Sequence, residues 1–152
     1  MRRTATILAT VALMVTFSSG VALATYGDSI TGTDHTDIIS GTGQAERILG
    51  LGGGDQLNGG GGADLIRGGK GKDELGDGYG TDTVYGGAGA DNLIGQSDAS
   101  VDHFYGSSGN DLFQPRDVPA VKDTVDCGPG TDTVYADKAD EVAGDCERVH
   151  VR

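Results

Sequence analysis

The chain has 152 residues, of which 28 are glycine and none is tryptophan, and its formal net charge is −12 at pH 7. Large apolar side chains are too few to fill a conventional layered core, and a surface this acidic repels nucleic acid and anionic lipid. The composition therefore excludes a nucleic-acid-binding protein and favours cations as partners.

The first segment, residues 1–24, has the layout of a secretory signal peptide. Arg2 and Arg3 precede an apolar run from about Ala5 to Phe17, and Ala22-Leu23-Ala24 is a small-x-small cleavage site. The alternative is a transmembrane anchor, but threonines interrupt the run, which is shorter than the roughly 20 residues that a span requires. We therefore predict a secreted, extracellular protein with no membrane insertion after signal removal.

Beyond this segment, an acidic residue recurs every nine positions, and an aliphatic residue follows each acid two positions later. Glycine-rich hexads separate each aliphatic residue from the next acid. Two periods that stay in step over this length indicate a repeated structural unit, in which the acid is sixth and the aliphatic residue eighth. The acids are Asp28, Asp37, Glu46, Asp55, Asp64, Asp73, Asp82 and Asp91.

Positions 7 to 9 of each unit have the pattern of a short strand, because position 8 is apolar and its neighbours are mostly polar. The hexad must reverse the chain tightly, which glycine permits through positive φ. Two units then form one coil, and successive coils stack at the strand spacing of roughly 4.8 Å. This arrangement predicts two ladders of carboxylates, one along each edge, with Asp55 and Asp73 on one and Asp64 and Asp82 on the other.

Central units such as Gly59–Arg67, Gly68–Gly76 and Gly86–Ile94 match the pattern G-G-x-G-x-D-x-U-x, where U is a large aliphatic residue. The chain resembles the RTX, or haemolysin-type, calcium-binding repeat family over about residues 26–135. The resemblance implies an all-β fold, a right-handed parallel β-roll (a β-solenoid) with two short strands per 18-residue coil. It also implies multiple Ca²⁺ ions, each shared between neighbouring turns on one edge.

Calcium suits such an edge because it takes six to eight oxygen ligands, whereas magnesium demands strict octahedral geometry. After Ile94 the register loosens, and the insertions in residues 95–105 and 115–126 are expected to bulge from turns and to cost individual sites. His35 and Gln44 replace the fourth glycine of their units and Glu46 replaces aspartate, so weaker sites are expected there. The candidate metal ligands are Asp37, Asp55, Gly59, Gly61, Asp64, Gly68, Asp73, Asp82, Gly86, Asp91, Asp102, Asp111, Asp123 and Asp132.

The tail, residues 136–152, breaks the glycine pattern and is predicted to cap the last coil, because a solenoid needs a cover over its open end. Cys127 and Cys146 are expected to form a disulfide, as an even pair of cysteines in an exported chain usually does. Two free thiols, or a zinc site that includes His150, are the alternatives. The chain is thus divided into a signal peptide at 1–24, a calcium-binding β-roll at 25–135 and a disulfide-bonded cap at 136–152.

The sequence contains no G-x-S-x-G, H-E-x-x-H or G-x-x-x-x-G-K-[ST] motif, so no enzymatic activity is expected. A glycosidase is disfavoured because its two carboxylates need unlike environments, and these acids are alike. The first hypothesis is a secreted calcium-ion-binding protein that folds when it binds calcium. The alternative is an extracellular adhesion module for a cell surface or polysaccharide, in which calcium is only structural and Tyr85, Tyr105 and Tyr135 form a stripe; ordinary edge tyrosines are the simpler interpretation.

Overall fold

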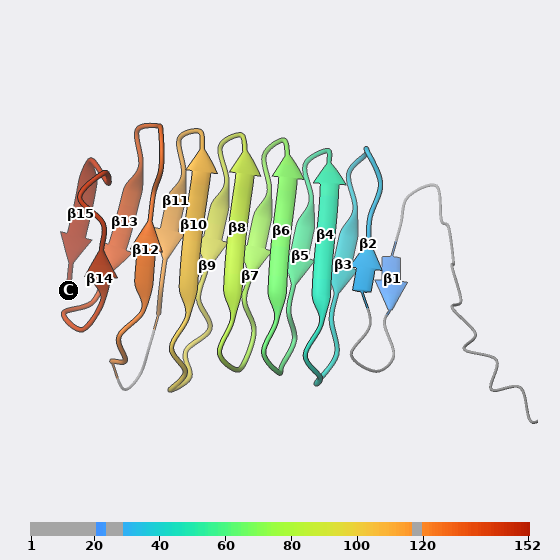
Figure 1. Cartoon of the computed structure of the whole chain (residues 1–152), viewed down its shortest axis with the longest axis horizontal. Helices are drawn as coiled ribbons and strands as arrows, with labels where there is room; N and C mark the ends of the chain where they lie inside the picture. The colour runs from blue at the N-terminus through green and yellow to red at the C-terminus, as the bar shows by residue number, and fades with distance from the viewer. Residues whose placement is uncertain (1–20, 24–28, 117–119) are drawn as a thin grey trace, which may run out of the picture.

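The structure is a computed structural model that describes residues 21–23, 29–116 and 120–152. Its strands form two parallel sheets that run along a single solenoid (Figure 1). One sheet contains the odd-numbered strands in the order β1-β3-β5-β7-β9-β11-β13-β15, and the other contains the even-numbered strands in the order β14-β12-β10-β8-β6-β4-β2. Within the described ranges no helix is long and apolar enough to cross a membrane. The expected all-β, parallel solenoid is confirmed.

We call the two layers the odd sheet and the even sheet. The odd sheet contains β1 (Val21–Leu23), β3 (Ile38–Ser40), β5 (Gln56–Asn58), β7 (Glu74–Gly76), β9 (Asn92–Ile94), β11 (Leu112–Gln114), β13 (Thr133–Ala136) and β15 (Arg148–Val151). The even sheet contains β2 (Ser29–Thr31), β4 (Arg47–Gly52), β6 (Leu65–Lys70), β8 (Thr83–Ala88), β10 (His103–Ser108), β12 (Thr124–Asp126) and β14 (Glu141–Val142).

The strands β4, β6, β8 and β10 are longer than the three residues that the repeat pattern predicts. Each has six residues, because it continues into the first glycines of the next unit. Those glycine segments also pair between coils, as in the registers Leu51↔Gly69 and Gly69↔Gly87. The even sheet is therefore wider than the odd sheet.

The core consists of two columns of position-8 side chains, one from each sheet. Register places Ile66 between Ile48 and Val84 in the even sheet, and Leu75 next to Leu57 in the odd sheet. These side chains are buried, which confirms that position 8 points inward. Burial of each such side chain contributes about 1.5–3 kcal/mol, so the columns hold the coils together although no conventional core exists.

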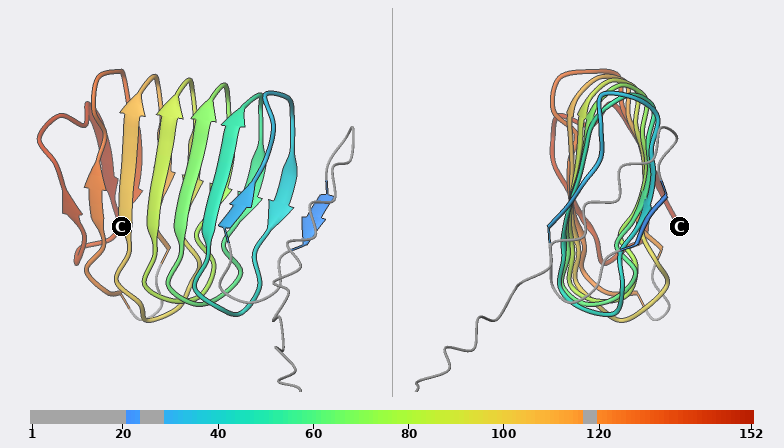
Figure 2. Two further views of the ribbon diagram at one scale, coloured as in Figure 1. Left: turned by 45° about the vertical axis from the view of Figure 1, so that its right-hand side comes forward. Right: turned by 90° about the vertical axis from the view of Figure 1, so that its right-hand side faces the viewer.

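Viewed from its end, the solenoid is a flattened tube in which successive coils superimpose (Figure 2). The insertions do not disturb this stacking. The backbone N–H of Asp73 donates to Asp91, which lies 18 residues later, whereas Asp82 donates to Asp102 after 20 residues and Asp111 to Asp132 after 21. The extra residues are therefore accommodated in the segments between the stacked acids, as predicted, although residues 117–119 lie outside the described part.

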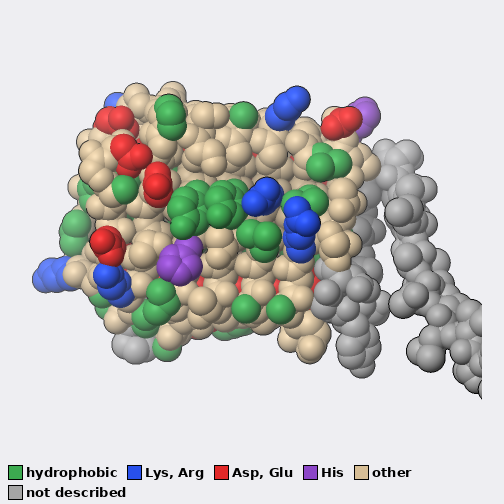
Figure 3. Space-filling view, in the orientation of Figure 1, with side chains coloured by type: hydrophobic (Ala, Val, Ile, Leu, Met, Phe, Trp, Pro, Cys, Tyr) green, Lys and Arg blue, Asp and Glu red, His purple; other side chains and the backbone are tan. Residues whose placement is uncertain are grey.

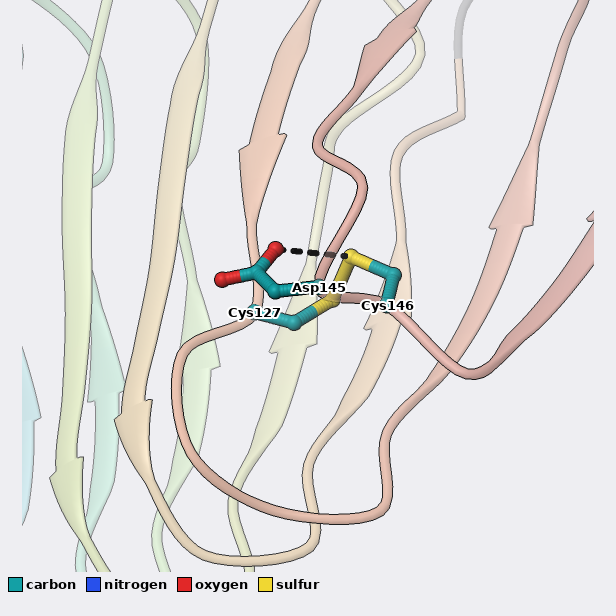
Figure 4. A group of neighbouring side chains, drawn as sticks. All are labelled: Cys127, Asp145 and Cys146. Carbon is teal, nitrogen blue, oxygen red and sulfur yellow. Dashed lines mark hydrogen bonds between the residues drawn. A yellow bond between two sulfur atoms is a disulfide. The ribbon is translucent and has the colours of Figure 1, made fainter.

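The tail extends both sheets instead of lying across the last coil as a separate cover. β14 pairs with β12, and β15 pairs with β13. Val142 and Val149 take the position-8 places in this register, which explains why the segment continues the pairing. A disulfide between Cys127 and Cys146, whose Cα atoms are 5.3 Å apart, joins the segment that precedes β15 to the turn that follows β12 (Figure 4).

The predicted signal peptide lies outside the described residues except for β1. The backbone of β1 pairs with β3, and Val21 is in register with Ile38. The signal peptide and the domain boundaries at residues 24 and 135 stay predictions.

Candidate calcium sites

Two rows of buried acids line the two edges of the solenoid, each acid directly before a strand. The row at one edge precedes the odd strands and contains Asp37, Asp55, Asp73, Asp91, Asp111 and Asp132. The row at the other edge precedes the even strands and contains Glu46, Asp64, Asp82, Asp102 and Asp123. Every one of these residues is at most 4% exposed. The two ladders predicted from the nine-residue period are therefore present.

In every acid of the two rows after Asp37 and Glu46, one carboxylate oxygen accepts a backbone N–H of the preceding coil. Asp73 Oδ1 accepts the backbone N–H of Asp55 at 2.8 Å, and Asp91 Oδ1 accepts that of Asp73 at 2.9 Å. The same bond recurs along both rows, and it ends at acids of the tail that the sequence analysis did not assign. There the N–H of Asp123 donates to Asp140, and the N–H of Asp132 donates to Glu147. This bond fixes the position of each carboxylate.

The other oxygen of many of these carboxylates has no partner. Such an atom is costly to bury, above all when the carboxylate is ionised, and it requires a proton or a cation. The buried oxygens without a hydrogen-bond partner are Oδ2 of Asp55, Asp64, Asp73, Asp77, Asp82, Asp91, Asp111 and Asp132.

The first glycine of a hexad lies beside such an oxygen. A Cβ added to Gly86 would be 2.7 Å from Asp91 Oδ2 and 2.8 Å from the carbonyl oxygen of Gly106, in the next coil. The same pair of oxygens, one carboxylate and one carbonyl, lies under 3.0 Å from a Cβ at Gly59 and at Gly68. A carboxylate from one coil and a carbonyl from the next thus face the same small space, which only glycine leaves open.

The sequence analysis expected positive φ throughout the hexad. The first glycine does not have it, and positive φ occurs at later positions of the hexad. Gly69 and Gly71, the second and fourth residues of their hexad, have φ of 118° and 127°. Gly61, a predicted ligand at the third position, has no carboxylate among the nearest neighbours of its Cβ position. Of the predicted glycines, the structure places Gly59, Gly68 and Gly86 beside a carboxylate oxygen and leaves Gly61 apart from it.

Burial raises the pKa of several aspartates in the two rows. The pKa values of Asp55, Asp64 and Asp91 rise from the usual 3.8 to about 6, and those of Asp82 and Asp111 rise to about 7. Loss of hydration is the largest cause, the backbone hydrogen bond opposes it, and the charges of neighbouring rungs add to it.

No basic side chain in the described part of the chain forms a salt bridge with an acid of the two rows. Among the described residues the single salt bridge joins Lys122 to Glu141, both of them exposed. In the lower part of the face drawn in Figure 3, only small patches of acidic side chains show between the backbone atoms. Within the residues that the structure describes, the negative charge of the rows is therefore buried without a salt-bridge partner.

In the first two acids of the rows, Asp37 and Glu46, threonine supplies the partner that the unpartnered Oδ2 atoms lack. Asp37 Oδ2 accepts the backbone N–H of Thr33 at 2.6 Å and its hydroxyl at 3.0 Å. The Glu46 carboxylate likewise accepts the N–H and the hydroxyl of Thr42. These bonds support the expectation of weaker cation sites at the N-terminal end.

The sequence analysis missed Asp77, which replaces the first glycine of its hexad. Its carboxylate lies with those of Asp82 and Asp102, with ligand atoms within 4.8 Å of one another. Burial, and after it the charge of Asp102, raises the pKa of Asp77 from the usual 3.8 to about 8. The signal was present in the sequence, since Asp77 is an acid in a column of glycines.

Cys127, Asp145 and Cys146 also lie close together, but both sulfurs belong to the disulfide (Figure 4). They supply no thiolate, and the alternatives of two free thiols or a zinc site are therefore wrong.

A parallel β-solenoid with buried acids along both edges defines a class of repeat protein whose turns can hold cations. The family model described as RTX calcium-binding nonapeptide repeat (4 copies) matches residues 40–75 and residues 77–113. The chain thus carries the RTX calcium-binding repeat, as its resemblance indicated. No curated protein and no solved structure matches the chain.

Proposed function

We propose that this protein is secreted, binds several calcium ions in the turns along both edges, and folds only when these ions are bound. The observation that supports the proposal is the series of buried Oδ2 atoms without a partner, most of them next to a glycine and a carbonyl oxygen. The repeat family to which the turns correspond is a calcium-binding one.

The residues fit calcium by their chemistry. Aspartates 55, 64, 73, 82, 91, 111 and 132 would supply charged oxygens, and the carbonyls at the first position of each hexad would supply neutral ones. Calcium accepts both kinds of oxygen in variable geometry. Softer metals require histidine or thiolate ligands, and the rows contain neither. When bound, calcium supplies the positive charge that the rows lack.

The energetics of the rows connect binding to folding. Moving a carboxyl pKa from 3.8 to about 6 costs about 3 kcal/mol at neutral pH. One such cost is already a large fraction of the 5–15 kcal/mol by which a typical domain is stable. An ion that binds only the folded chain returns about 2.7 kcal/mol per site at a concentration of 100 Kd. The roll is therefore expected to be unfolded at neutral pH until calcium occupies its turns.

Circular dichroism of the mature chain tests this proposal. The far-UV spectrum in EGTA should be that of a disordered chain, and calcium should convert it cooperatively to a β spectrum. Magnesium at the same concentration is the control and should leave the chain disordered. Native mass spectrometry then counts the bound ions. Identical spectra in EGTA and in calcium would refute the proposal.

A second candidate function is recognition of a cell surface or polysaccharide by the even sheet. The rings of Tyr85 and Tyr105 stack with centroids 4.7 Å apart, and the Arg67 guanidinium lies 4.9 Å from the Tyr85 centroid. Figure 3 shows hydrophobic and basic side chains gathered in the middle of this face. Such a row can stack against sugar rings and bind acidic groups.

The stripe expected from the sequence included Tyr135, and that part was wrong. Tyr135 belongs to β13 in the odd sheet, where its ring stacks on His150, because successive units alternate between the sheets. This placement supplies a control. Retention on bacterial cell-wall polysaccharide in saturating calcium should fall for Tyr85→Ala and stay unchanged for Tyr135→Ala. Equal retention of both variants would remove this second candidate.

A further inference from the structure

The turn between β7 and β8 departs from the repeat at its first residue. Gly59, Gly68 and Gly86 occupy this position in other units, whereas this unit has Asp77. The side chain of Asp77 is 0% exposed. Its Oδ1 accepts the backbone N–H groups of Gly78 at 2.6 Å and Gln96 at 2.7 Å, whereas its buried Oδ2 has no partner.

Asp77 brings a third carboxylate to a place where two rungs already meet. Asp82 precedes β8 and Asp102 precedes β10, and each of the three residues places a ligand atom within 4.8 Å of the other two. All three side chains are at most 1% exposed. Asp82 Oδ2, like Asp77 Oδ2, is buried without a hydrogen-bond partner. Two unpartnered oxygens therefore belong to one cluster.

The insertion in residues 95–105 holds this cluster in place. The backbone N–H of Gln96 donates to Asp77. Asp98 Oδ2 accepts the N–H of Gly80 at 2.9 Å, and Asp98 Oδ1 accepts that of Ser100 at 2.8 Å. The residues that were expected to cost a site thus fix the turn around it. Fixed ligands lose little freedom when an ion binds.

We propose that Asp77, Asp82 and Asp102 form a three-carboxylate site for a hard divalent or trivalent cation, the tightest site of the roll and the first to fill. The affinity of oxygen sites for calcium rises with the number of charged ligands and with rigidity, and this turn exceeds the others in both. The inference deepens the proposed function and rests on it. A proton shared within the cluster is the rival explanation, because it would satisfy the same oxygens without an ion.

Terbium, a trivalent ion that replaces calcium at oxygen sites, reports on this turn directly. Tyr79 lies two residues after Asp77 in the same turn, and this proximity allows its ring to sensitise the emission of an ion held there. In the mature chain, the first equivalent of terbium should produce tyrosine-sensitised emission, and calcium should displace that ion last. Tyr79→Phe should lose most of the emission and retain the affinity, as measured by competition with a chromophoric chelator.

Asp77→Asn is the decisive variant, because the amide oxygen can still accept from Gly78 and Gln96 while the charge is removed. Its first binding step should weaken by about tenfold or more, with an unchanged circular dichroism spectrum in saturating calcium. Asp126→Asn, which removes an exposed charge at the end of β12, is the matched control and should bind as the wild type does. If Asp77→Asn does not fold in calcium, Asp77→Gly, which restores the residue of the repeat, takes its place.

The outcomes separate this inference from the proposed function. A wild type that folds in calcium, with an equal first step in the folded Asp77 variant, would overturn the three-carboxylate site and leave the calcium-driven roll intact. A wild type that shows no calcium response would overturn both. A selective loss of the first step in the Asp77 variant would support the site against a shared proton.

Discussion

Asp91→Asn separates the two roles of a row carboxylate, which accepts a backbone N–H through one oxygen and carries an unpartnered charge on the other. Asp91 is 2% exposed, its Oδ1 accepts the N–H of Asp73, and its Oδ2 lies buried without a partner beside Gly86. Asparagine retains the accepting oxygen and removes the charge. The change should therefore stabilise the roll without calcium and lose that benefit when calcium is present.

The magnitude follows from the pKa of Asp91, which burial raises from 3.8 to about 6. At pH 7 the ionised carboxylate opposes folding by about 3 kcal/mol, and asparagine removes up to that amount. In calcium the variant loses an ion contact worth about 2.7 kcal/mol at 100 Kd and about 4.1 kcal/mol at 1,000 Kd. The gain in EGTA should thus be cancelled or reversed in calcium.

Osmolyte-induced folding measures the first half of this prediction, because trimethylamine N-oxide favours burial even for an unstable chain. In EGTA the folding midpoint of Asp91→Asn should fall to a lower osmolyte concentration than that of the wild type. A calcium titration without osmolyte measures the second half. Asp126→Asn controls for net charge. Equal stabilisation in both conditions would mean that no ion contacts Asp91, and destabilisation in both would mean that its Oδ2 is not an uncompensated charge.

Three further changes probe the pH response, the glycine space and the disulfide. The folded chain without calcium binds more protons than the unfolded chain, so its stability is full below pH 3.8 and is lost as pH rises through about 6 to 7; the β signal in EGTA should grow on acidification from pH 8 to pH 5. Gly86→Ala should lower stability in calcium by about 1–3 kcal/mol in thermal unfolding, whereas Gly43→Ala, with nothing within 4 Å of its Cβ position, should not. Paired Cys127→Ser and Cys146→Ser substitutions should cost about 3 kcal/mol and leave the number of calcium ions in native mass spectra unchanged.

The regular part of the fold could be predicted because each repeat position has the same structural role in successive units. Position 8 is apolar in every unit, so the inward columns that contain Ile66 and Leu75 follow from strand alternation alone. The division of the acids into two edges follows from two units per coil. Asp55 and Asp64, nine residues apart in sequence, accordingly lie in different rows.

The contacts of the residues that depart from the pattern could not be predicted, because the pattern assigns a structural role only to residues that match it. Asp77 is a mismatch in the sequence and becomes a cluster member only when the coil that carries Asp102 lies beside it. Thr33 and Thr42 are ordinary turn residues until their hydroxyls are seen to bond the neighbouring acids. Both findings depend on contacts between residues that the nine-residue pattern does not relate.

The different roles of the two carboxylate oxygens explain why aspartate suits the sixth position of the repeat. One oxygen must reach the backbone N–H of the preceding coil, and the other must stay beside the first glycine of its own turn, as in Asp91. Both oxygens of the longer Glu46 side chain bond Thr42 of the same turn. A rung of that kind stacks without an ion, because its charge is met by donors from its own turn. If the proposed function holds, we expect the N-terminal coils to require less calcium than the central ones.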